Sequence, residues 1–213
     1  MRIGFVVNPI AGMGGRVGLK GTDGKVDEAR ARGAEQRAPE RARRVLSALV
    51  DAAPDATVLT WGGDMGESVA DAVGVDAEVL GRVDGAETTA ADTRAAVRAF
   101  VDADADLVLF VGGDGTAADV AEAVDGSDVP MLGAPAGVKV YSSVFALSPE
   151  DAAEVAATFE RTERREVMDI DEDDYRSGEV NPELRAVGAV PVAENLQSSK
   201  QLGGGSVDAV AAG

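Results

Sequence analysis

The sequence predicts an α/β fold: an open parallel sheet with flanking helices, followed by the start of a smaller strand-rich second domain. Two observations support this fold class. Short apolar runs alternate with longer helix-like segments through about residue 147, which is typical of a parallel sheet covered on both faces. Beyond that point the apolar runs are short or alternating and are separated by turns, which favours antiparallel strands. We therefore expect an α/β domain over 1–147 and a helix with a partial strand-rich domain over 148–213.

Five apolar runs in the first domain predict strands. Each is five or six residues long and is bounded by turn residues or by a change to a helix-like pattern. In chain order the runs are RIGFVV at 2–7, TVLTW at 57–61, the weaker AEVLG at 77–81, LVLFV at 107–111 and PMLGA from residue 130.

The segments between these runs predict helices. Residues 25–53 are charged and rich in alanine, and they predict a long helix that is broken near Pro39 and carries an apolar stripe in its second half. The other helices are expected after GGDMG at 62–66, from a capped start near Thr88 or Thr89, from Thr116, and over 148–161. Antiparallel strands are expected between 164 and 195.

The chain is strongly acidic. Its 213 residues include 38 Asp and Glu against 20 Lys and Arg, for a formal charge of −18, and the only lysines are Lys20, Lys25, Lys139 and Lys200. Such a surface suits solubility in high salt and disfavours nucleic acid or an anionic membrane as a partner. Because salt screens repulsion between acidic groups, we expect stability to rise toward molar salt.

The sequence contains no cysteine and no histidine. Disulfides, thiol chemistry, Cys or His zinc sites and imidazole bases are thereby excluded, and carboxylates, hydroxyls, lysines and backbone dipoles are left for any chemistry. The apolar run in MRIGFVVNPIAG is too short to span a membrane and makes a weak signal peptide. These features predict a cytoplasmic protein.

Four loops are expected to meet at one edge of the sheet. Asn8 of VVNP, the glycines after Trp61, the turn GGDGT at 112–116 and the loop APAG at 134–137 each follow a predicted strand. Parallel strands place their carboxyl ends at the same edge, and ligands of open parallel sheets bind there.

The turn GGDGT predicts a phosphate cradle. Gly112, Gly113 and Gly115 let backbone N–H groups approach an anion closely, and the helix that follows adds its positive dipole end. Asp114 repels phosphate, so it needs another role. It could accept a proton from an attacking hydroxyl or help to hold Mg²⁺ between phosphates, or it could cap the helix or stabilise the turn. Asp64 of GGDMG matches Asp114 but lacks the following glycine and threonine, so a helix cap is the first interpretation and ligand contact the second.

Five motifs in order carry a family resemblance. VGGDGTAADV resembles the signature of the NAD kinase and diacylglycerol kinase superfamily. Together with NPIAGMGG, GGDMGE, TTAADT and APAGVKVYSSVFA it looks like the ATP-NAD kinase-like branch of archaea and bacteria. The resemblance implies a nucleotide-binding domain over 1–147 that transfers a phosphoryl group from ATP or polyphosphate to the 2′-hydroxyl of the adenosine ribose of NAD, giving NADP. It also implies Asp114 as the catalytic aspartate.

The resemblance extends to a set of site residues. With Mg²⁺ neutralising charge, donor phosphates or the NAD pyrophosphate would lie against Gly112, Gly113, Gly115, Thr116, Asn8, Gly12, Gly14 and Gly15. Substrate contacts are hypothesised at Thr89, Asp92, Thr93, Lys139, Tyr141, Ser142 and Asp64. For the residues from Thr88 to Thr93 the alternative is a helix N-terminus. Alternatives for the whole chain are a lipid kinase of the diacylglycerol or sphingoid-base type and a non-catalytic nucleotide-binding regulatory module. The sequence allows a homo-oligomer without specifying one.

Overall fold

The structure is a computed structural model that describes residues 1–13, 28, 31–85, 87–137, 139–170 and 182–197. Its main sheet has five strands in the order β3–β2–β1–β4–β5, and every neighbouring pair is parallel. The strands are β1 (Arg2–Val7), β2 (Thr57–Thr60), β3 (Glu78–Val79), β4 (Leu107–Gly112) and β5 (Met131–Pro135). The predicted open parallel sheet is confirmed.

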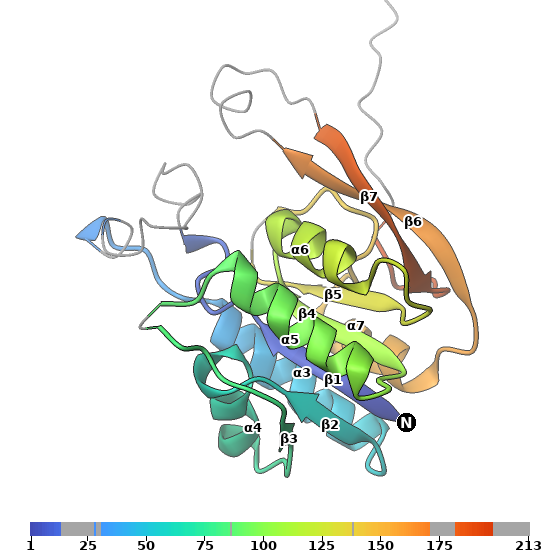
Figure 1. The fold of residues 1–213 in the computed structure, drawn as a ribbon, viewed down its shortest axis with the longest axis horizontal. Helices are drawn as coiled ribbons and strands as arrows, with labels where there is room; N and C mark the ends of the chain where they lie inside the picture. The colour runs from blue at the N-terminus through green and yellow to red at the C-terminus, as the bar shows by residue number, and fades with distance from the viewer. Residues whose placement is uncertain (14–27, 29–30, 86, 138, 171–181, 198–213) are drawn as a thin grey trace, which may run out of the picture.

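Helices cover both faces of this sheet. They are α3 (Ala38–Ala52), the single-turn η1 (Gly63–Met65), α4 (Glu67–Val73), α5 (Ala90–Asp102), α6 (Asp114–Val124) and α7 (Pro149–Thr158). Figure 1 shows α5 and α6 side by side in front of the sheet, with α3 and α7 behind it. Within the described ranges, no helix is long and apolar enough to cross a membrane.

Buried apolar side chains explain this layered arrangement. All six residues of β4 are buried, as expected for a central strand of a parallel sheet. Helix α3 buries an apolar stripe at helical spacing toward the sheet, and the stripe consists of Ala38, Ala42, Val45, Leu46 and Leu49. Gly4 of β1 gives room to Phe100 of α5, because a Cβ there would lie 2.5 Å from the Phe100 ring.

Two predicted helix boundaries were wrong. Pro39 does not interrupt a long helix but lies in the first turn of α3, where proline lacks only an N–H that has no intrahelical partner. Gly33 to Arg37 precede that helix without being helical, and residues 25–27, 29 and 30 of the predicted segment lie outside the described residues. Helix α6 begins at Asp114 and not at Thr116, because the extended N-cap is Gly113 and the residues that follow it are already helical.

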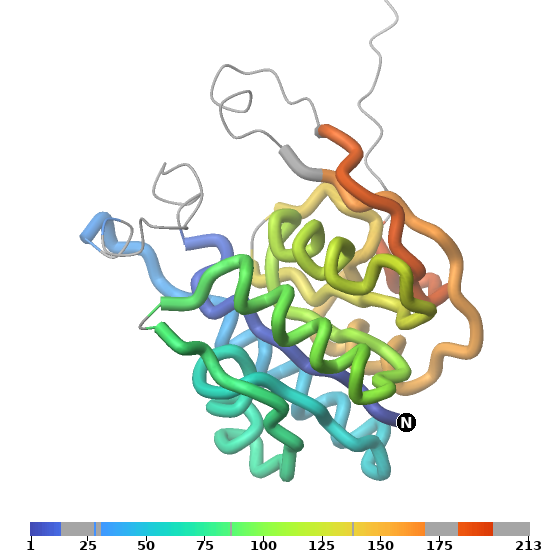
Figure 2. The backbone as a smooth tube through the Cα atoms, in the orientation of Figure 1, coloured from blue at the N-terminus to red at the C-terminus, as the bar shows by residue number. Residues whose placement is uncertain are grey.

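The predicted antiparallel strands are β6 (Thr162–Ile170) and β7 (Pro182–Pro191), which form a separate two-stranded sheet. This sheet lies beside α6, as the orange and red segments of Figure 2 show. Helix α7, which precedes it, packs on α3 of the main layer, and Arg44 makes two hydrogen bonds of 2.8 Å to Glu150 there. A domain boundary at residue 147 stays a prediction.

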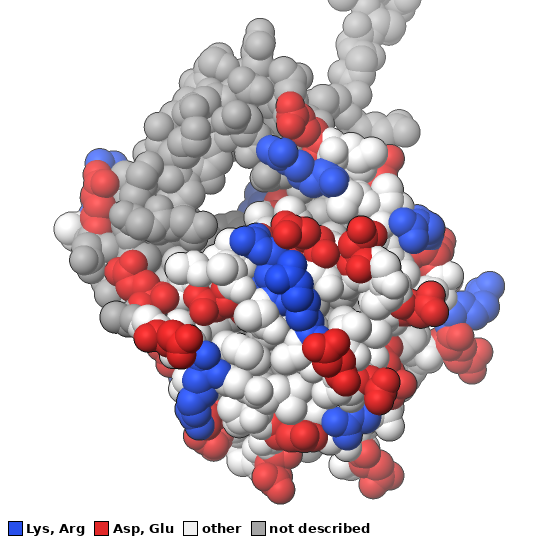
Figure 3. All heavy atoms as spheres, viewed as in Figure 1, with Lys and Arg blue, Asp and Glu red and all other residues white. Residues whose placement is uncertain are grey.

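Charged side chains of both signs are interspersed on the face seen in Figure 3, with acidic groups spread widely over it. Arginines of the described residues repeatedly pair with acidic neighbours, as in Arg82 with Glu67 and Arg94 with Asp119. Because the chain has 38 acidic and 20 basic residues, many acidic side chains have no basic residue to pair with.

Candidate functional site

The loop after β1 is joined directly to the turn after β4. The Asn8 backbone N–H donates to the Val111 carbonyl at 3.0 Å, and Asn8 Nδ2 donates to Thr116 Oγ1 at 3.0 Å. Asn8 Oδ1 also accepts a bond of 3.2 Å from the backbone of Ile10. The predicted convergence of VVNP and GGDGT at one edge is thus confirmed. Gly12 of the same loop has φ +78°, a conformation that favours glycine, whereas Gly14 and Gly15 lie outside the described residues.

The glycines of GGDGT differ in what they do. A Cβ on Gly112 would lie 2.5 Å from Thr116 Cβ, so glycine there makes room for the buried Thr116 side chain. Gly113 is the extended N-cap of α6. Gly115 is exposed, and a Cβ built on it would meet nothing within 4 Å. The backbone of the first turn of α6 can therefore be approached from solvent at Gly115.

The N-terminus of α6 has the properties of an anion site. An α-helix leaves the N–H groups of its first turn without intrahelical acceptors, and its dipole places partial positive charge there. In α6 this end lies at the carboxyl edge of the sheet, between β4 and the loop that carries Asn8. A phosphate or carboxylate could accept hydrogen bonds at this position.

Asp114 is the first residue of α6, and the loop after β5 donates several hydrogen bonds to its carboxylate. The Tyr141 N–H donates to Oδ1 at 3.1 Å and to Oδ2 at 2.9 Å. The Ser142 N–H and hydroxyl donate to Oδ1 at 2.8 and 2.6 Å. Gly113, and not Asp114, is the N-cap of the helix, so the capping interpretation of Asp114 was wrong. These donors orient the half-buried carboxylate and stabilise its negative charge.

The loop after β5 brings three of the predicted substrate-binding residues to this edge. Its backbone joins the GGDGT turn through the Ala136 N–H, which donates to the Gly112 carbonyl at 2.9 Å. Lys139 Nζ lies 4.6 Å from the centre of the Tyr141 ring, at cation–π distance. The buried Tyr141 hydroxyl has no hydrogen-bond partner within the described part of the chain. Ser142 is instead directed inward, toward Asp114 and β6.

Comparison with protein families fits this arrangement of loops. The model of the ATP-NAD kinase N-terminal domain matches residues 3–164, which is well over half of the chain. The chain belongs to the ATP-NAD kinase family. It is therefore a domain of the NAD kinase type, a class of phosphotransferases.

Comparison with individual proteins adds less. A search of the curated proteins finds no match. Among solved structures, the chain is similar to a crystal structure of UDP-N-acetylglucosamine 2-epimerase at 12% identity and a TM-score of 0.35. That similarity covers 73% of this chain and 38% of the other, so the chain spans well under half of that protein's length.

Asp64, the counterpart of Asp114 in GGDMG, is placed quite differently. It is exposed within η1, and its described hydrogen bond comes from the Ser68 hydroxyl at 3.3 Å. Gly62 and Gly66 are the N-caps of η1 and α4, and neither helix has a side-chain cap bond. The prediction that Asp64 caps a helix was therefore wrong. The GGDGT and GGDMG turns both connect a strand to a helix, but their aspartates make different contacts.

Thr89 and Asp92 form a capping box at the N-terminus of α5. Asp92 Oδ2 accepts bonds from the Thr89 N–H at 2.9 Å and from its hydroxyl at 2.7 Å. Thr93 is buried against the core, with 3% of its surface exposed. The alternative interpretation, a helix N-terminus, accounts for these contacts, and substrate binding by these residues stays a hypothesis.

Arg37 is a site-edge residue that sequence reasoning missed. It precedes α3, and a Cβ on Gly137 would lie 3.2 Å from Arg37 Cδ, which places the arginine stem against the loop that holds Asp114. Arg37 is exposed and takes part in no ion pair with any described residue. Nothing in the sequence distinguishes it from the other arginines of this region, since only the fold brings it to Gly137.

The residues present also limit where a metal could bind. Within the described ranges, no three acidic side chains cluster in a way that could hold a metal ion. Mg²⁺ commonly binds through one or two carboxylates together with substrate phosphates and water. The single carboxylate of Asp114 would thus suit a metal ion that arrives already bound to a polyphosphate donor. It would not by itself form a dedicated metal site.

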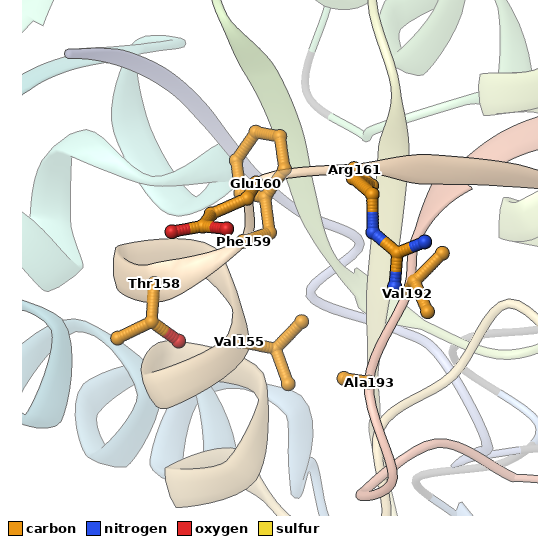
Figure 4. A pocket seen from close by; sticks show the side chains of 7 residues that line it. All are labelled: Val155, Thr158, Phe159, Glu160, Arg161, Val192 and Ala193. Atoms are coloured by element: carbon orange, nitrogen blue, oxygen red, sulfur yellow. The ribbon is translucent and has the colours of Figure 1, made fainter.

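A cavity of about 190 Å³ lies elsewhere, between the end of α7 and the adjoining ends of β6 and β7 (Figure 4). Its lining residues are Val155, Thr158, Phe159, Glu160, Arg161, Val192 and Ala193. None of them belongs to the four loops at the carboxyl edge of the main sheet. The cavity is therefore separate from the candidate phosphate site.

Proposed function

We propose that the chain carries the phosphoryl-transfer site of an NAD kinase, of the archaeal or bacterial type. The reaction moves a phosphoryl group from ATP or polyphosphate to the 2′-hydroxyl of the adenosine ribose of NAD, giving NADP. The observation that supports this best is the oriented Asp114 carboxylate at the N-terminus of α6. An anion site and a proton acceptor are the two parts that this transfer requires.

In this proposal the first turn of α6 binds phosphate through its N–H groups, with Gly115 leaving the approach open. Asn8 and Gly12 lie on the loop beside this turn, and Lys139 and Arg37 supply positive charge at the edge of the site. Asp114 accepts the proton of the ribose hydroxyl while the new O–P bond forms and the bond from phosphorus to the donor breaks. Mg²⁺ supplies neutralisation of the donor phosphates when bound. A cytoplasmic location stays a prediction.

A non-catalytic nucleotide-binding module is the second candidate. It is favoured by the hydrogen bonds that the Asp114 carboxylate already accepts, because they also explain the residue as a link between two loops. The lipid-kinase alternative is less favoured, since a chain of charge −18 is repelled by an anionic bilayer.

The test incubates the chain in molar KCl with NAD and Mg²⁺, adding ATP in one series and polyphosphate in the other. NADP is detected with an NADP-specific dehydrogenase, and nucleotide binding is measured in parallel by calorimetry. We expect NADP with at least one donor. Binding without NADP from either donor would instead support the non-catalytic module. In a parallel series that offers diacylglycerol in place of NAD, its phosphorylation would support the lipid kinase.

A further inference from the structure

Ser142 lies between the Asp114 carboxylate and strand β6. Its side chain is almost fully buried, at 1% exposed, and its Oγ is 2.6 Å from Asp114 Oδ1 and 2.9 Å from the Met168 nitrogen. We propose that Ser142 is a positioning residue, which fixes the catalytic carboxylate from the second sheet and does not bind substrate. This inference rests on the proposed role of Asp114 as the base.

The hydrogen-bond pattern sets the direction of the Ser142 proton. The Met168 N–H donates to Ser142 Oγ, so the hydroxyl must use its single proton on another acceptor. Two acceptors lie within reach, Asp114 Oδ1 at 2.6 Å and the Met168 carbonyl at 3.0 Å. The carboxylate is charged, and 2.6 Å is typical of a hydroxyl that donates to a carboxylate. Ser142 therefore accepts from β6 and donates to Asp114.

Strand β6 is irregular at the residue that contacts Ser142. The register of β6 with β7 shifts between Val167 and Met168, which pair with Ala186 and Leu184. Such bulges redirect a strand locally and occur often beside active sites. The irregularity coincides with the position where the Met168 N–H and carbonyl both meet the Ser142 hydroxyl.

Ser143 anchors the same loop to the same strand. Its N–H and hydroxyl lie 3.1 and 3.2 Å from the Glu166 carbonyl. Glu166 and Met168 are two residues apart, so they present their backbone groups to the same edge of β6. Both serines thus attach the loop to β6, but the described side-chain bonds of Ser143 do not include Asp114. Ser143 is the matched control for Ser142.

Removing the Ser142 hydroxyl takes away one donor and leaves the backbone donors of residues 141 and 142 in place. For Ser142→Ala we expect kcat to fall about tenfold, the scale of one hydrogen bond to a charged group, with KM for NAD and for the donor within about twofold. The acid limb of the pH profile of kcat/KM should move to higher pH, because a carboxylate with fewer donors is protonated more readily. Ser143→Ala should leave that limb in place.

The carboxyl ¹³C signal of Asp114, assigned by its loss in Asp114→Asn, gives a readout that needs no turnover. Its titration midpoint should rise in Ser142→Ala, stay unchanged in Ser143→Ala and return toward the parent value in Ser142→Thr, which restores a hydroxyl. If Ser142→Ala does not fold, Ser142→Cys is slightly larger but keeps a weaker S–H donor at the same position, and its midpoint should rise less.

The two proposals fail in different ways. A parent chain that makes no NADP would remove the proposed function, and the ¹³C titration would still decide whether Ser142 controls the carboxylate. An unchanged Asp114 midpoint in both Ser142→Ala and Ser142→Cys would overturn the inference, as would equal shifts in the Ser142 and Ser143 variants. A shift confined to the Ser142 variants would support it.

Discussion

The two aspartate turns of this chain begin with the same three residues and end in different structures. In GGDGT, Asp114 starts an eleven-residue helix, and its carboxylate is held by the loop after β5. In GGDMG, Asp64 lies in a single exposed turn, and the next helix starts only after Gly66, whose φ is +150°. Tyr141 and Ser142 of the loop after β5 donate hydrogen bonds to Asp114, whereas the described hydrogen bond of Asp64 comes from Ser68 of the following helix.

A carboxylate gains a fixed direction only when donors from another loop surround it. The described contacts of Asp64 include no donor from another loop. Within its turn, the Gly63 N–H donates a 2.8 Å bond to the Glu67 carboxylate instead. The GGD tripeptide therefore marks a strand-to-helix turn, whereas the residues that follow and the opposite loop decide whether that turn can carry a proton acceptor.

The largest expected effect separates these two aspartates in activity. Asp114→Asn should lower turnover by about 10² to 10⁴, the usual contribution of a general base, while nucleotide still binds. Asp64→Asn should cost less than about threefold, because within the described part of the chain that carboxylate is bonded only by Ser68 of the adjoining helix. Both variants are compared in the NADP assay and by calorimetry at one salt concentration.

Other outcomes of this pair would be equally informative. Equal losses of turnover would mean that both turns contact the ligand or its metal. Loss of nucleotide binding in Asp114→Asn would favour a role in holding the loop after β5 in place of proton transfer.

Much of the fold could be predicted because local pattern and tertiary structure agree. Every predicted strand of the main sheet is present, and the helix-like segments flank it. The early start of α6 was missed because glycine and aspartate favour turns as readily as first helical residues. Pro39 was misplaced because a proline within a charged, alanine-rich run is compatible with either a break or a helix start.

The candidate site was predictable only where its residues lie in edge loops. The Asn8 to Thr116 contact follows from the alternation of strands and helices, since that alternation fixes which loops meet. The contacts of Ser142 with β6 and of Arg37 with Gly137 could not be predicted, because each depends on which segment packs opposite. Met168 contributes only backbone groups, so its side chain carries no signal of the contact.

A second comparison sets Gly112 against Gly115 within the GGDGT turn. Gly112→Ala should destabilise the chain by about 1 to 3 kcal/mol, because the new methyl would meet the Thr116 side chain at 2.5 Å. Gly115→Ala has open space around it and should change stability by less than about 1 kcal/mol, in the stabilising direction that alanine favours in helices. Thermal melting followed by circular dichroism measures both.

The effect on the KM for the phosphoryl donor should be larger for Gly115→Ala, although that variant should be the more stable of the two. If phosphate approaches the backbone at Gly115, the methyl of Gly115→Ala should raise the donor KM several-fold in a well-folded protein. An unchanged donor KM in that variant would place the phosphate elsewhere.

Arg37 and Arg43 give a smaller contrast, between an arginine at the site edge and one on the exposed side of α3. Arg37→Ala should raise the KM for the donor by about three- to tenfold, the scale of one exposed charge contact to phosphate, and the effect should shrink in high salt. Arg43→Ala should leave the KM unchanged. Equal effects of the two variants would reduce Arg37 to a contribution to net charge.

The smallest expected effect concerns the turn that lacks a gripping loop. Hydrogen bonding to Arg82, and then to the Gly63 N–H, holds the pKa of Glu67 below its ordinary value of 4.5. A lowered pKa means that the stabilisation is complete above the ordinary value and is lost as the pH falls through the lowered one. Because the pair lies at the surface, Glu67→Gln should lower the melting temperature at pH 7 by no more than about 2 °C, and the difference should shrink in molar KCl and as the pH falls below the ordinary value of 4.5. The parent itself should melt at higher temperature in molar KCl, since salt relieves its acidic repulsion. A loss of turnover in Glu67→Gln, in place of a small loss of stability, would indicate that the GGDMG turn contacts the ligand. The contrast between the two aspartates would then be wrong.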